Sequence, residues 1–246
     1  MEVLGIDIGG SGIKGAPVNL EQGKLADERC RIETPDPATP EAVADVVGQI
    51  ARHFKWTGAI GCTFPAVVMH GVVRTAANVD KSWIGTDGKQ LLGESSGCEV
   101  TLLNDADAAA IAEMQFGAGR GVQGVVFLLT LGTGIGTAMF VNGILIPNLE
   151  LGHLEYDGKE AEHQAAARVR TDEDLKWDAY AARIDRCLEV YENLFWPDLF
   201  IIGGGVSKKG EKYIPLLKRR TKIVAAETRN EAGIIGAALA AAGEGV

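Results

Sequence analysis

The sequence lacks a C-x-x-C pair and a long apolar run, although it is 246 residues long. Its cysteines, Cys30, Cys62, Cys98 and Cys187, are scattered, and this spacing favours reduced thiols over a disulfide framework. No apolar run reaches the ~18 residues that cross a bilayer, and the N-terminus enters a strand pattern without an export signal. We therefore expect a cytoplasmic protein with no membrane partner.

Basic residues are fewer than acidic ones, and the net charge is −9. This charge argues against binding to nucleic acid. The exception is segment 208–222, which holds seven basic residues and one acidic residue. Such a segment attracts a polyanion locally, whereas a solvated helix face is the ordinary alternative. The basic residues are Lys208, Lys209, Lys212, Lys218, Arg219, Arg220 and Lys222.

A glycine-rich stretch near the N-terminus is repeated about halfway along the chain. Residues 4–8 and 13–18 predict two strands joined by a glycine turn, and residues 125–141 repeat this pattern. Glycines let consecutive N–H groups converge on an anion, although tight hairpins without a ligand are the alternative. The repetition predicts two phosphate-binding turns, which include Gly9, Gly10 and Ser11 in the first copy and Thr133 and Gly134 in the second.

Asp7 places a carboxylate at the mouth of the first turn. A carboxylate beside a bound phosphate requires a divalent cation or an ordered water between the two negative groups. We therefore expect Mg²⁺ to accompany the phosphate ligand, with Asp7 reaching the ion through water.

The order of the predicted elements indicates two α/β halves in tandem. Helical spacing is expected over 41–54, 105–116 and, with many charges, 160–195, while residues 76–92 lack a period and favour a loop. Strands are expected at 59–63, 99–103 and 200–202. We expect a small lobe of residues 1–104, on which the small-residue helix within 231–246 packs back, and a larger lobe of residues 105–230.

Two polar groups carry the candidate chemistry. Asn104 and Asp105 follow a predicted strand, where ligands gather in open α/β sheets. Asp105 can accept a hydroxyl proton while Asn104 holds a sugar hydroxyl, although Asp105 or Asp107 can instead cap the next helix. Glu150 and His153 add the mixed donors and acceptors that a polyhydroxyl ligand needs.

These motifs occur in an order that resembles the ROK family of bacterial sugar kinases, and most closely its polyphosphate-dependent glucokinase branch. The resemblance covers nearly the whole chain and implies the two-lobed, actin-like, ribonuclease-H-type α/β fold with a cleft between the lobes. It rests on LGIDIGGSGIKG, TFPAVV, LLNDADAAAIAE, LLTLGTGIGTA, LELGHLE, LFIIGGGVSK and TRNEAGIIGAA.

The resemblance also implies roles for individual residues. Asp105 is the expected base for the 6-hydroxyl of glucose, and Glu162, with Glu155 as its competitor, corresponds to a family glutamate. The other residues expected at the sugar are Asn78, Asn104, Glu150 and His153. Those expected at the phosphate donor are Gly9, Gly10, Ser11, Thr133 and, where relatives place the nucleoside, Gly203, Gly204 and Gly205.

Two departures from the family pattern qualify these assignments. The cysteine-rich zinc segment of most ROK kinases is missing after Gly152 and His153, so we expect no zinc. Many relatives carry a lysine directly after the glycine triplet, where this chain has Gly12, and this leaves the donor role of Lys14 open. Lys208, Lys209 and Lys212 follow the triple glycine and are expected to guide a linear polyphosphate.

The sequence therefore predicts a phosphotransferase that moves the terminal phosphoryl group of inorganic polyphosphate to the 6-hydroxyl of glucose, with ATP as a further candidate donor. An ATP-dependent ROK hexokinase is the alternative enzyme. A non-catalytic sugar-binding ROK protein and a filament-forming actin relative are the alternatives outside catalysis. A DNA-binding ROK regulator is disfavoured because the first turn begins near residue 7. A homodimer is expected by analogy with the family.

Overall fold

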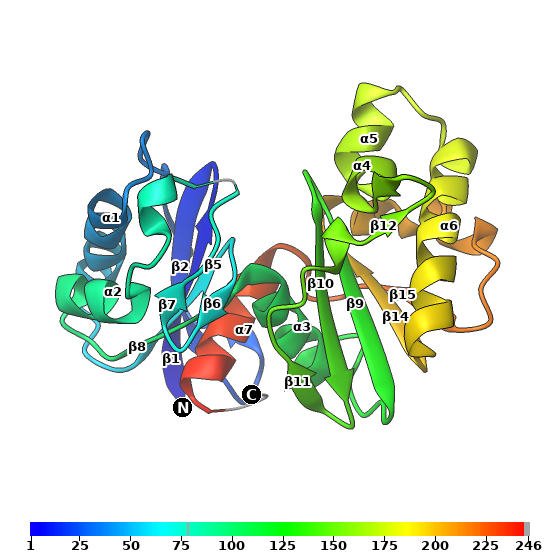
Figure 1. The fold of residues 1–246 in the computed structure, drawn as a ribbon. Coiled ribbons are helices and arrows are strands. Elements are labelled where there is room, and N and C mark those ends of the chain that lie inside the picture. Colours follow the sequence, from blue (N-terminus) through cyan, green and yellow to red (C-terminus); the bar gives the residue numbers. More distant parts are fainter. Residues whose placement is uncertain (78, 244–246) are drawn as a thin grey trace. The chain divides into compact units, whose positions relative to one another are not determined.

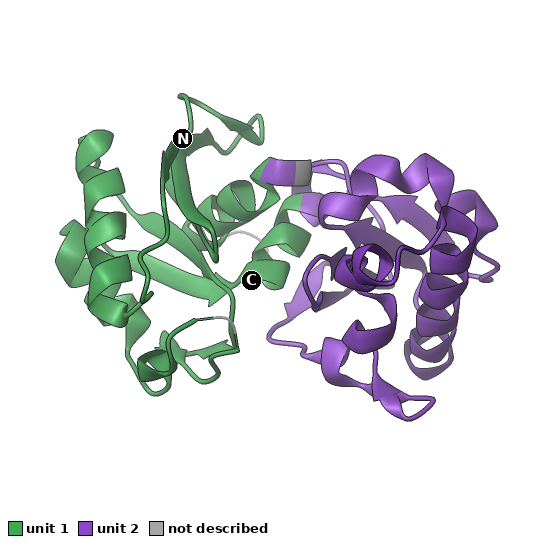
Figure 2. Ribbon diagram, turned by 90° about the horizontal axis from the view of Figure 1, so that it is seen from above, with its two compact units in different colours: residues 1–112, 231–246 green, residues 113–230 purple. Residues whose placement is uncertain are grey.

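The computed structural model describes residues 1–77 and 79–243, which form two compact α/β units (Figures 1 and 2). Unit 1 comprises Met1–Ala112 and Glu231–Val246, and unit 2 comprises Glu113–Asn230. The division falls inside a helix, later than the boundary expected at residue 104, because the first turns of that helix pack within unit 1. None of the helices in the described residues is both long and apolar enough to cross a bilayer.

Unit 1 is built on a sheet in which three neighbouring strands run parallel. The strand order is β3-β2-β1-β5-β8, with β4 also paired to β2. Strands β1 and β2 form the predicted antiparallel hairpin, and β1, β5 and β8 pair in parallel. The strands are β1 (Glu2–Gly9), β2 (Gly12–Asn19), β3 (Lys24–Leu25), β4 (Cys30–Ile32), β5 (Ile60–Phe64) and β8 (Val100–Asn104).

Helices cover both faces of this sheet, with α1 and α2 on one face and α7 on the other (Figure 1). The further elements are α1 (Pro40–His53), β6 (Val68–Met69), β7 (Val72–Val73), the 3₁₀ helix η1 (Lys81–Trp83), α2 (Gly88–Ser96), α3 (Asp105–Phe116), η5 (Arg229–Glu231), which straddles the division, and α7 (Ala232–Ala241).

The two faces of this sheet differ because side chains of different character alternate along β1. Leu4, Ile6 and Ile8 are almost fully buried in the core that they share with α1. Gly5 and Asp7 point to the opposite face, because successive side chains of a strand alternate. Burial of the apolar set against α1 therefore leaves small and polar positions for α7.

Helix α7 lies so close to the sheet that side chains cannot fit between them. A Cβ atom on Gly61 would lie 1.8 Å from the carbonyl oxygen of Ala237, and one on Gly5 would lie 2.0 Å from that of Ile234. A Cβ atom on Gly236 would lie 1.7 Å from the carbonyl oxygen of Ala108 on α3. The small residues of α7 thus serve close packing within unit 1.

Unit 2 repeats the pattern of an antiparallel hairpin next to parallel strands. The sheet order is β11-β10-β9-β14-β15, with β9 and β10 antiparallel and β9, β14 and β15 parallel. Phe127 of β9 stacks on Tyr191 at 5.1 Å between ring centroids in the main core. The strands are β9 (Val125–Leu131), β10 (Ile135–Val141), β11 (Ile144–Ile146), β14 (Leu199–Gly203) and β15 (Lys222–Ala225).

The remaining elements of unit 2 include α6, which packs against the sheet through the core around Tyr191. They are η2 (Leu151–His153), β12 (Glu155–Tyr156), β13 (Lys159–Glu160), α4 (Glu162–Ala165), α5 (Ala167–Asp172), α6 (Trp177–Phe195), η3 (Gly205–Lys212) and η4 (Ile214–Leu216).

Two expectations about helices need correction. Residues 76–92 are not all loop, because Asp87 caps α2 by accepting a hydrogen bond from the Gln90 amide at 2.9 Å. The expected helical stretch 160–195 is three helices, because extended Ala166 separates α4 from α5 and residues 173–176 separate α5 from α6. The predicted strands and the helices at 41–54 and 105–116 are confirmed within one or two residues at each end.

We predict that Gly61→Ala lowers the free energy of unfolding by about 2–3 kcal/mol, because the added methyl group meets backbone rather than a movable side chain. Gly58→Ala is the matched control, since its added Cβ would lie 3.4 Å or more from its neighbours. Urea unfolding of both variants measures the difference. Equal stability of the two variants would show that α7 does not need this close approach.

Candidate functional site

The carboxyl ends of β1, β5 and β8 bring three predicted segments of unit 1 to one edge of the sheet. Asp7 pairs in register with Thr63, and Phe64 pairs with Asn104. The turn at Gly9 therefore lies on the same edge as Asn104. Ligands of open α/β sheets bind at this edge, so the parallel pairing assembles the candidate site of unit 1.

Asn104 caps helix α3. Its side-chain Oδ1 accepts hydrogen bonds from the amides of Ala106 at 2.8 Å and Asp107 at 3.2 Å. Its Nδ2 donates to the carbonyl oxygen of Ala66 at 3.2 Å, and the residue is 8% exposed. Asn104 therefore takes a capping role that was considered for Asp105 or Asp107, and among the described residues one of its two Nδ2 hydrogens has an acceptor.

Asp105 is exposed at the first position of α3. Its Oδ1 accepts a hydrogen bond from the amide of Ala106 at 2.8 Å. The positive end of the helix dipole favours negative charge at this position. A carboxylate that is exposed and oriented by the helix has the geometry of a proton acceptor for a bound hydroxyl.

Asp7 lies in a small polar network below the first glycine turn. Its Oδ2 is 3.6 Å from Nζ of Lys14, and its Oδ1 accepts a hydrogen bond from Oγ1 of Thr63 at 2.9 Å. Oγ1 of Thr63 accepts in turn from the Ile8 amide at 3.2 Å. A Cβ on Gly233 would lie 3.0 Å from Oδ1 of Asp7. Lys14 therefore supplies the positive charge nearest to Asp7, and contact with a hydrated ion suits this carboxylate better than direct ligation.

Arg31 also lies at the first turn, although the sequence did not single it out. Its Nη2 donates to the carbonyl oxygen of Ser11 at 3.0 Å, and strand pairing sets it opposite Lys14. Arg31 adds a second cation beside the turn. No motif marks it, because pairing of β4 with β2 brings it there.

Two glycine segments of unit 2 meet at the carboxyl ends of β9 and β14. Gly203 pairs with Thr130, and a Cβ on Gly204, which has φ of +79°, would lie 2.3 Å from the carbonyl oxygen of Leu131. The amide of Arg168 donates to the carbonyl oxygen of Gly132 at 3.1 Å. The segments 132–134 and 203–205 thus form one edge, next to the starts of α5 and η3, and Thr133 is exposed there.

A second polar group of unit 2 surrounds His153. Its Nδ1 is 3.1 Å from Oε2 of Glu160, and its Nε2 is 3.7 Å from Oε2 of Glu150. Glu162 lies 3.9 Å from Nε2 of His163, and its Oε2 accepts from the amide of Ile135 at 3.4 Å. The structure thus brings Glu150, His153 and Glu162 together and adds Glu160, which the sequence did not single out.

Backbone contacts hold this group against β10. Oγ1 of Thr137 donates to the carbonyl oxygen of Leu149 at 2.7 Å and accepts from the amide of Leu151 at 3.1 Å. A Cβ on Gly152 would lie 2.2 Å from the carbonyl oxygen of Ile135, so only glycine fits there. Glycine at 152 is therefore what allows His153 to lie beside the turn of the second hairpin.

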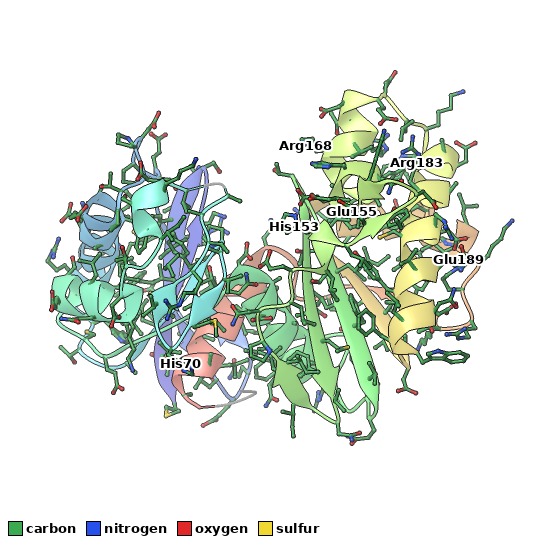
Figure 3. All side chains as sticks on the ribbon, in the orientation of Figure 1. His70, His153, Glu155, Arg168, Arg183 and Glu189 are labelled. Atoms are coloured by element: carbon green, nitrogen blue, oxygen red, sulfur yellow. The ribbon has the colours of Figure 1, made fainter. Side chains whose placement is uncertain are left out.

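Glu155 is exposed on β12 and takes no part in the ion pairs of His153 (Figure 3). Glu162, in contrast, influences the pKa of both Glu150 and His153. Of the two competing glutamates, Glu162 is therefore the one that lies in this group. Asn78 is outside the described residues.

The surroundings of two members of this group, Glu150 and His153, raise their pKa values. The hydrogen bond to Glu160 is the main cause that raises the pKa of His153, although partial burial opposes it. Burial is the main cause that raises the pKa of Glu150. A protonated His153 donates from both ring nitrogens, whereas carboxylates accept, so the group can pair with several hydroxyls of one ligand.

His153, Glu160 and Glu162 also offer ligand atoms within 4.8 Å of one another, a spacing suited to a metal ion. Exposed acidic groups with this spacing are common without a metal. The expectation that zinc is absent stays a prediction.

The basic segment 208–222 divides into two parts. Arg219 forms ion pairs with Asp185 at 3.0 Å and Glu189 at 3.4 Å, and Arg220 stacks on Trp196 at 3.6 Å. Lys208, Lys209 and Lys212 of η3 have no acidic partner within 4 Å in the part of the chain that the structure describes. The lysines of η3 are therefore available to an anion. The side chains of Arg219 and Arg220 are instead held by contacts with α6 and with Trp196 at its end.

Comparison with known proteins extends these findings. The sequence model of the ROK family matches residues 3–168 of this chain. The chain is 54% identical to the polyphosphate glucokinase of Mycobacterium tuberculosis (strain ATCC 25618 / H37Rv), over 96% of this chain and 90% of that protein. It is 50% identical, with a TM-score of 0.93, to the crystal structure of an inorganic polyphosphate/ATP-glucomannokinase from Arthrobacter sp. strain KM, which covers 98% of both chains.

A more distant structure shares the fold. The ROK family glucokinase from Streptomyces griseus, solved with glucose and AMPPNP, has a TM-score of 0.82 at 24% identity over 97% of this chain and 98% of that chain. The predicted fold class, the two-lobed actin-like α/β fold, is confirmed by these likenesses.

We predict that Glu160→Gln lowers the pKa of His153 toward its ordinary value, because it removes the main cause of the upward shift. The positively charged form of His153 would then be lost at lower pH than in the unchanged protein. Titration of His153 by NMR measures the shift. Glu155→Gln is the control and leaves the titration unchanged, and equal effects of the two substitutions would rule out the contact with Glu160 as the cause.

Proposed function

We propose that this chain, which belongs to the ROK family, moves the terminal phosphoryl group of inorganic polyphosphate to the 6-hydroxyl of glucose. The observation that carries the proposal is 54% identity, over nearly the whole chain, with a relative named polyphosphate glucokinase. The exposed Asp105 and the two glycine turns are the features of the chain that this reaction requires.

Asp105 is the general base in this proposal. As O6 of glucose attacks the terminal phosphorus, the carboxylate accepts the hydroxyl proton. The O6–P bond forms and the bridging P–O bond breaks, so the departing oxygen remains as an anion on the shortened chain. Exposure of Asp105 at the start of α3 supports the role, and the neighbouring Asn104 caps the same helix.

We assign glucose binding to side chains that offer both donors and acceptors. Asn104 retains one N–H, while Glu150, His153 and Glu162 form a group whose members already interact. Pairing every buried hydroxyl is the main source of sugar specificity. Asn78 belongs to this proposal through the family resemblance alone.

The phosphate donor is assigned to the glycine turns and to nearby cations. Backbone N–H groups of Gly9, Gly10, Ser11, Thr133 and Gly134 are suited to phosphate oxygens, and Gly203, Gly204 and Gly205 lie at the same sheet edge as the second turn. Lys208, Lys209 and Lys212 are proposed to guide the rest of a polyphosphate chain. Lys14 is proposed either to position Asp7, with which it forms an ion pair, or to contact the donor phosphates directly.

Mg²⁺ is proposed to accompany the donor. Its charge would offset the negative charge of the donor phosphates. Asp7 fits a contact through water, because Lys14 and Thr63 already occupy its oxygens.

Use of ATP is a second candidate activity. It is favoured by the glycines at 203–205 and by the Arthrobacter relative, which is named an inorganic polyphosphate/ATP-glucomannokinase. A non-catalytic sugar-binding protein is the remaining alternative, and it would not need the carboxylate of Asp105. Supplying each donor separately to purified protein with glucose distinguishes these cases.

We further propose that the protein acts in the cytoplasm as a homodimer, without nucleic acid or a membrane. Four free cysteines, of which Cys62 and Cys187 are buried, suit a reducing compartment. The net charge of −9 disfavours nucleic acid. The dimer rests on analogy with the family.

We predict that Asp105→Asn lowers kcat by about 10²–10⁴-fold, because the amide cannot accept the proton, while glucose still binds. Asp87→Asn is the matched control, since Asp87 also begins a helix and asparagine is an equally good cap. Steady-state kinetics measures kcat, and calorimetry measures glucose binding. Near-normal turnover in Asp105→Asn would remove this residue from the mechanism.

We predict that added salt weakens binding of long polyphosphate steeply and hardly changes binding of glucose. Lysines that neutralise phosphates release counterions, whose release becomes less favourable as salt increases. Equilibrium binding of each ligand across a salt series measures the two slopes. A flat response for polyphosphate would argue against the lysines of η3 as its contacts.

A further inference from the structure

Trp177, the first residue of α6, is flanked by two cations from other elements. Cζ of Arg170 on α5 lies 4.1 Å from the ring centroid, and Nζ of Lys212 at the end of η3 lies 5.7 Å from it. The same ring stacks on Tyr213 with centroids 5.9 Å apart and an interplanar angle of 13°. Two positive groups from different elements are therefore positioned by one aromatic side chain.

Neither cation has an acidic partner within 4 Å among residues 1–77 and 79–243. Nε of Arg170 is buried and has no hydrogen-bond partner among these residues, and the same is true of the hydroxyl of the fully buried Tyr213. A buried donor without a partner lowers the stability of the folded protein. Binding of a ligand by these side chains would explain why they are present. Arg183 on α6 (Figure 3), in contrast, pairs with Glu173 at 3.1 Å.

The stacking leaves Arg170 suited to an anion. A guanidinium group that lies over an aromatic ring keeps its N–H groups in its own plane, where they can form two parallel bonds to phosphate. Lys212 adds a point charge with rotatable donors. Together the two side chains offer what a phosphate group needs, and the indole restricts where they can move.

Both cations belong to elements that start at the donor edge of unit 2. Helix α5 begins beside the second glycine turn, because the Arg168 amide donates to the carbonyl oxygen of Gly132 at 3.1 Å. The 3₁₀ helix η3 begins at Gly205 and ends at Lys212. Arg170 is two residues beyond Arg168, about 3 Å further along the helix. Each cation therefore lies further along an element that starts at the donor edge.

We propose that Arg170 and Lys212, positioned by Trp177, form a second phosphate subsite that binds a remote part of the polyphosphate chain. The inference rests on the proposed function and adds two residues, Arg170 and Trp177, that no sequence motif indicates. A linear polyphosphate held at the turn has further phosphates to place, whereas tripolyphosphate has few. The subsite therefore favours long chains over short ones.

Selectivity for chain length tests the proposal. Arg170→Gln and Lys212→Gln are each expected to raise the ratio of the KM for long-chain polyphosphate to the KM for tripolyphosphate about tenfold or more, by removing a charged hydrogen bond. Arg183→Gln is the control, because its partner is Glu173, and it leaves this ratio unchanged. Direct binding of long-chain polyphosphate without glucose should weaken in parallel.

The outcomes separate this inference from the proposed function. If the unchanged protein does not transfer phosphate from polyphosphate to glucose, the proposed function fails and the subsite fails with it. If transfer occurs and both variants keep the ratio of the control, the subsite is overturned and the function stands. Should Arg170→Gln disturb folding in thermal unfolding, Arg170→Lys decides, because it keeps the charge and removes the planar group that forms two parallel bonds to phosphate.

Discussion

Parallel strand pairing is the constraint on which the candidate site depends. In unit 1 it aligns the ends of β1, β5 and β8, so the first glycine turn and Asp105 share one edge. In unit 2 it aligns the ends of β9 and β14, so the glycines at 132–134 and 203–205 meet. This alignment requires helices to cover both faces of each sheet. The close approach of α7, with glycine at 5 and 61, provides that cover in unit 1.

Features with a strong local pattern could be predicted from the sequence. The two hairpins, the helix that begins at Asp105 and the glycine stop after β14 follow from apolar runs and turn residues. Helix α2 was missed because few of its residues are buried, so its apolar period is weak. Arg31, Glu160, Arg170 and Trp177 could not be identified either, because tertiary packing rather than spacing brings them to their neighbours.

Charge pairing decides which basic residues can serve a phosphate ligand. The sequence presents 208–222 as one basic segment, but acidic residues of α6 neutralise Arg219 and anchor Arg220. The lysines of η3 lack such partners among the described residues, and they follow directly on the glycines of the donor edge. On a protein with a net charge of −9, this arrangement confines attraction for a polyanion to a small surface.

Phosphoryl transfer without nucleotide is the central claim, and ³¹P NMR tests it most directly. Purified protein is incubated with glucose, Mg²⁺ and inorganic polyphosphate in the absence of ATP. The account predicts a growing phosphomonoester signal from glucose phosphorylated at its 6-hydroxyl, with a matching loss of polyphosphate. A sugar phosphate that forms only after ATP is added would contradict the account.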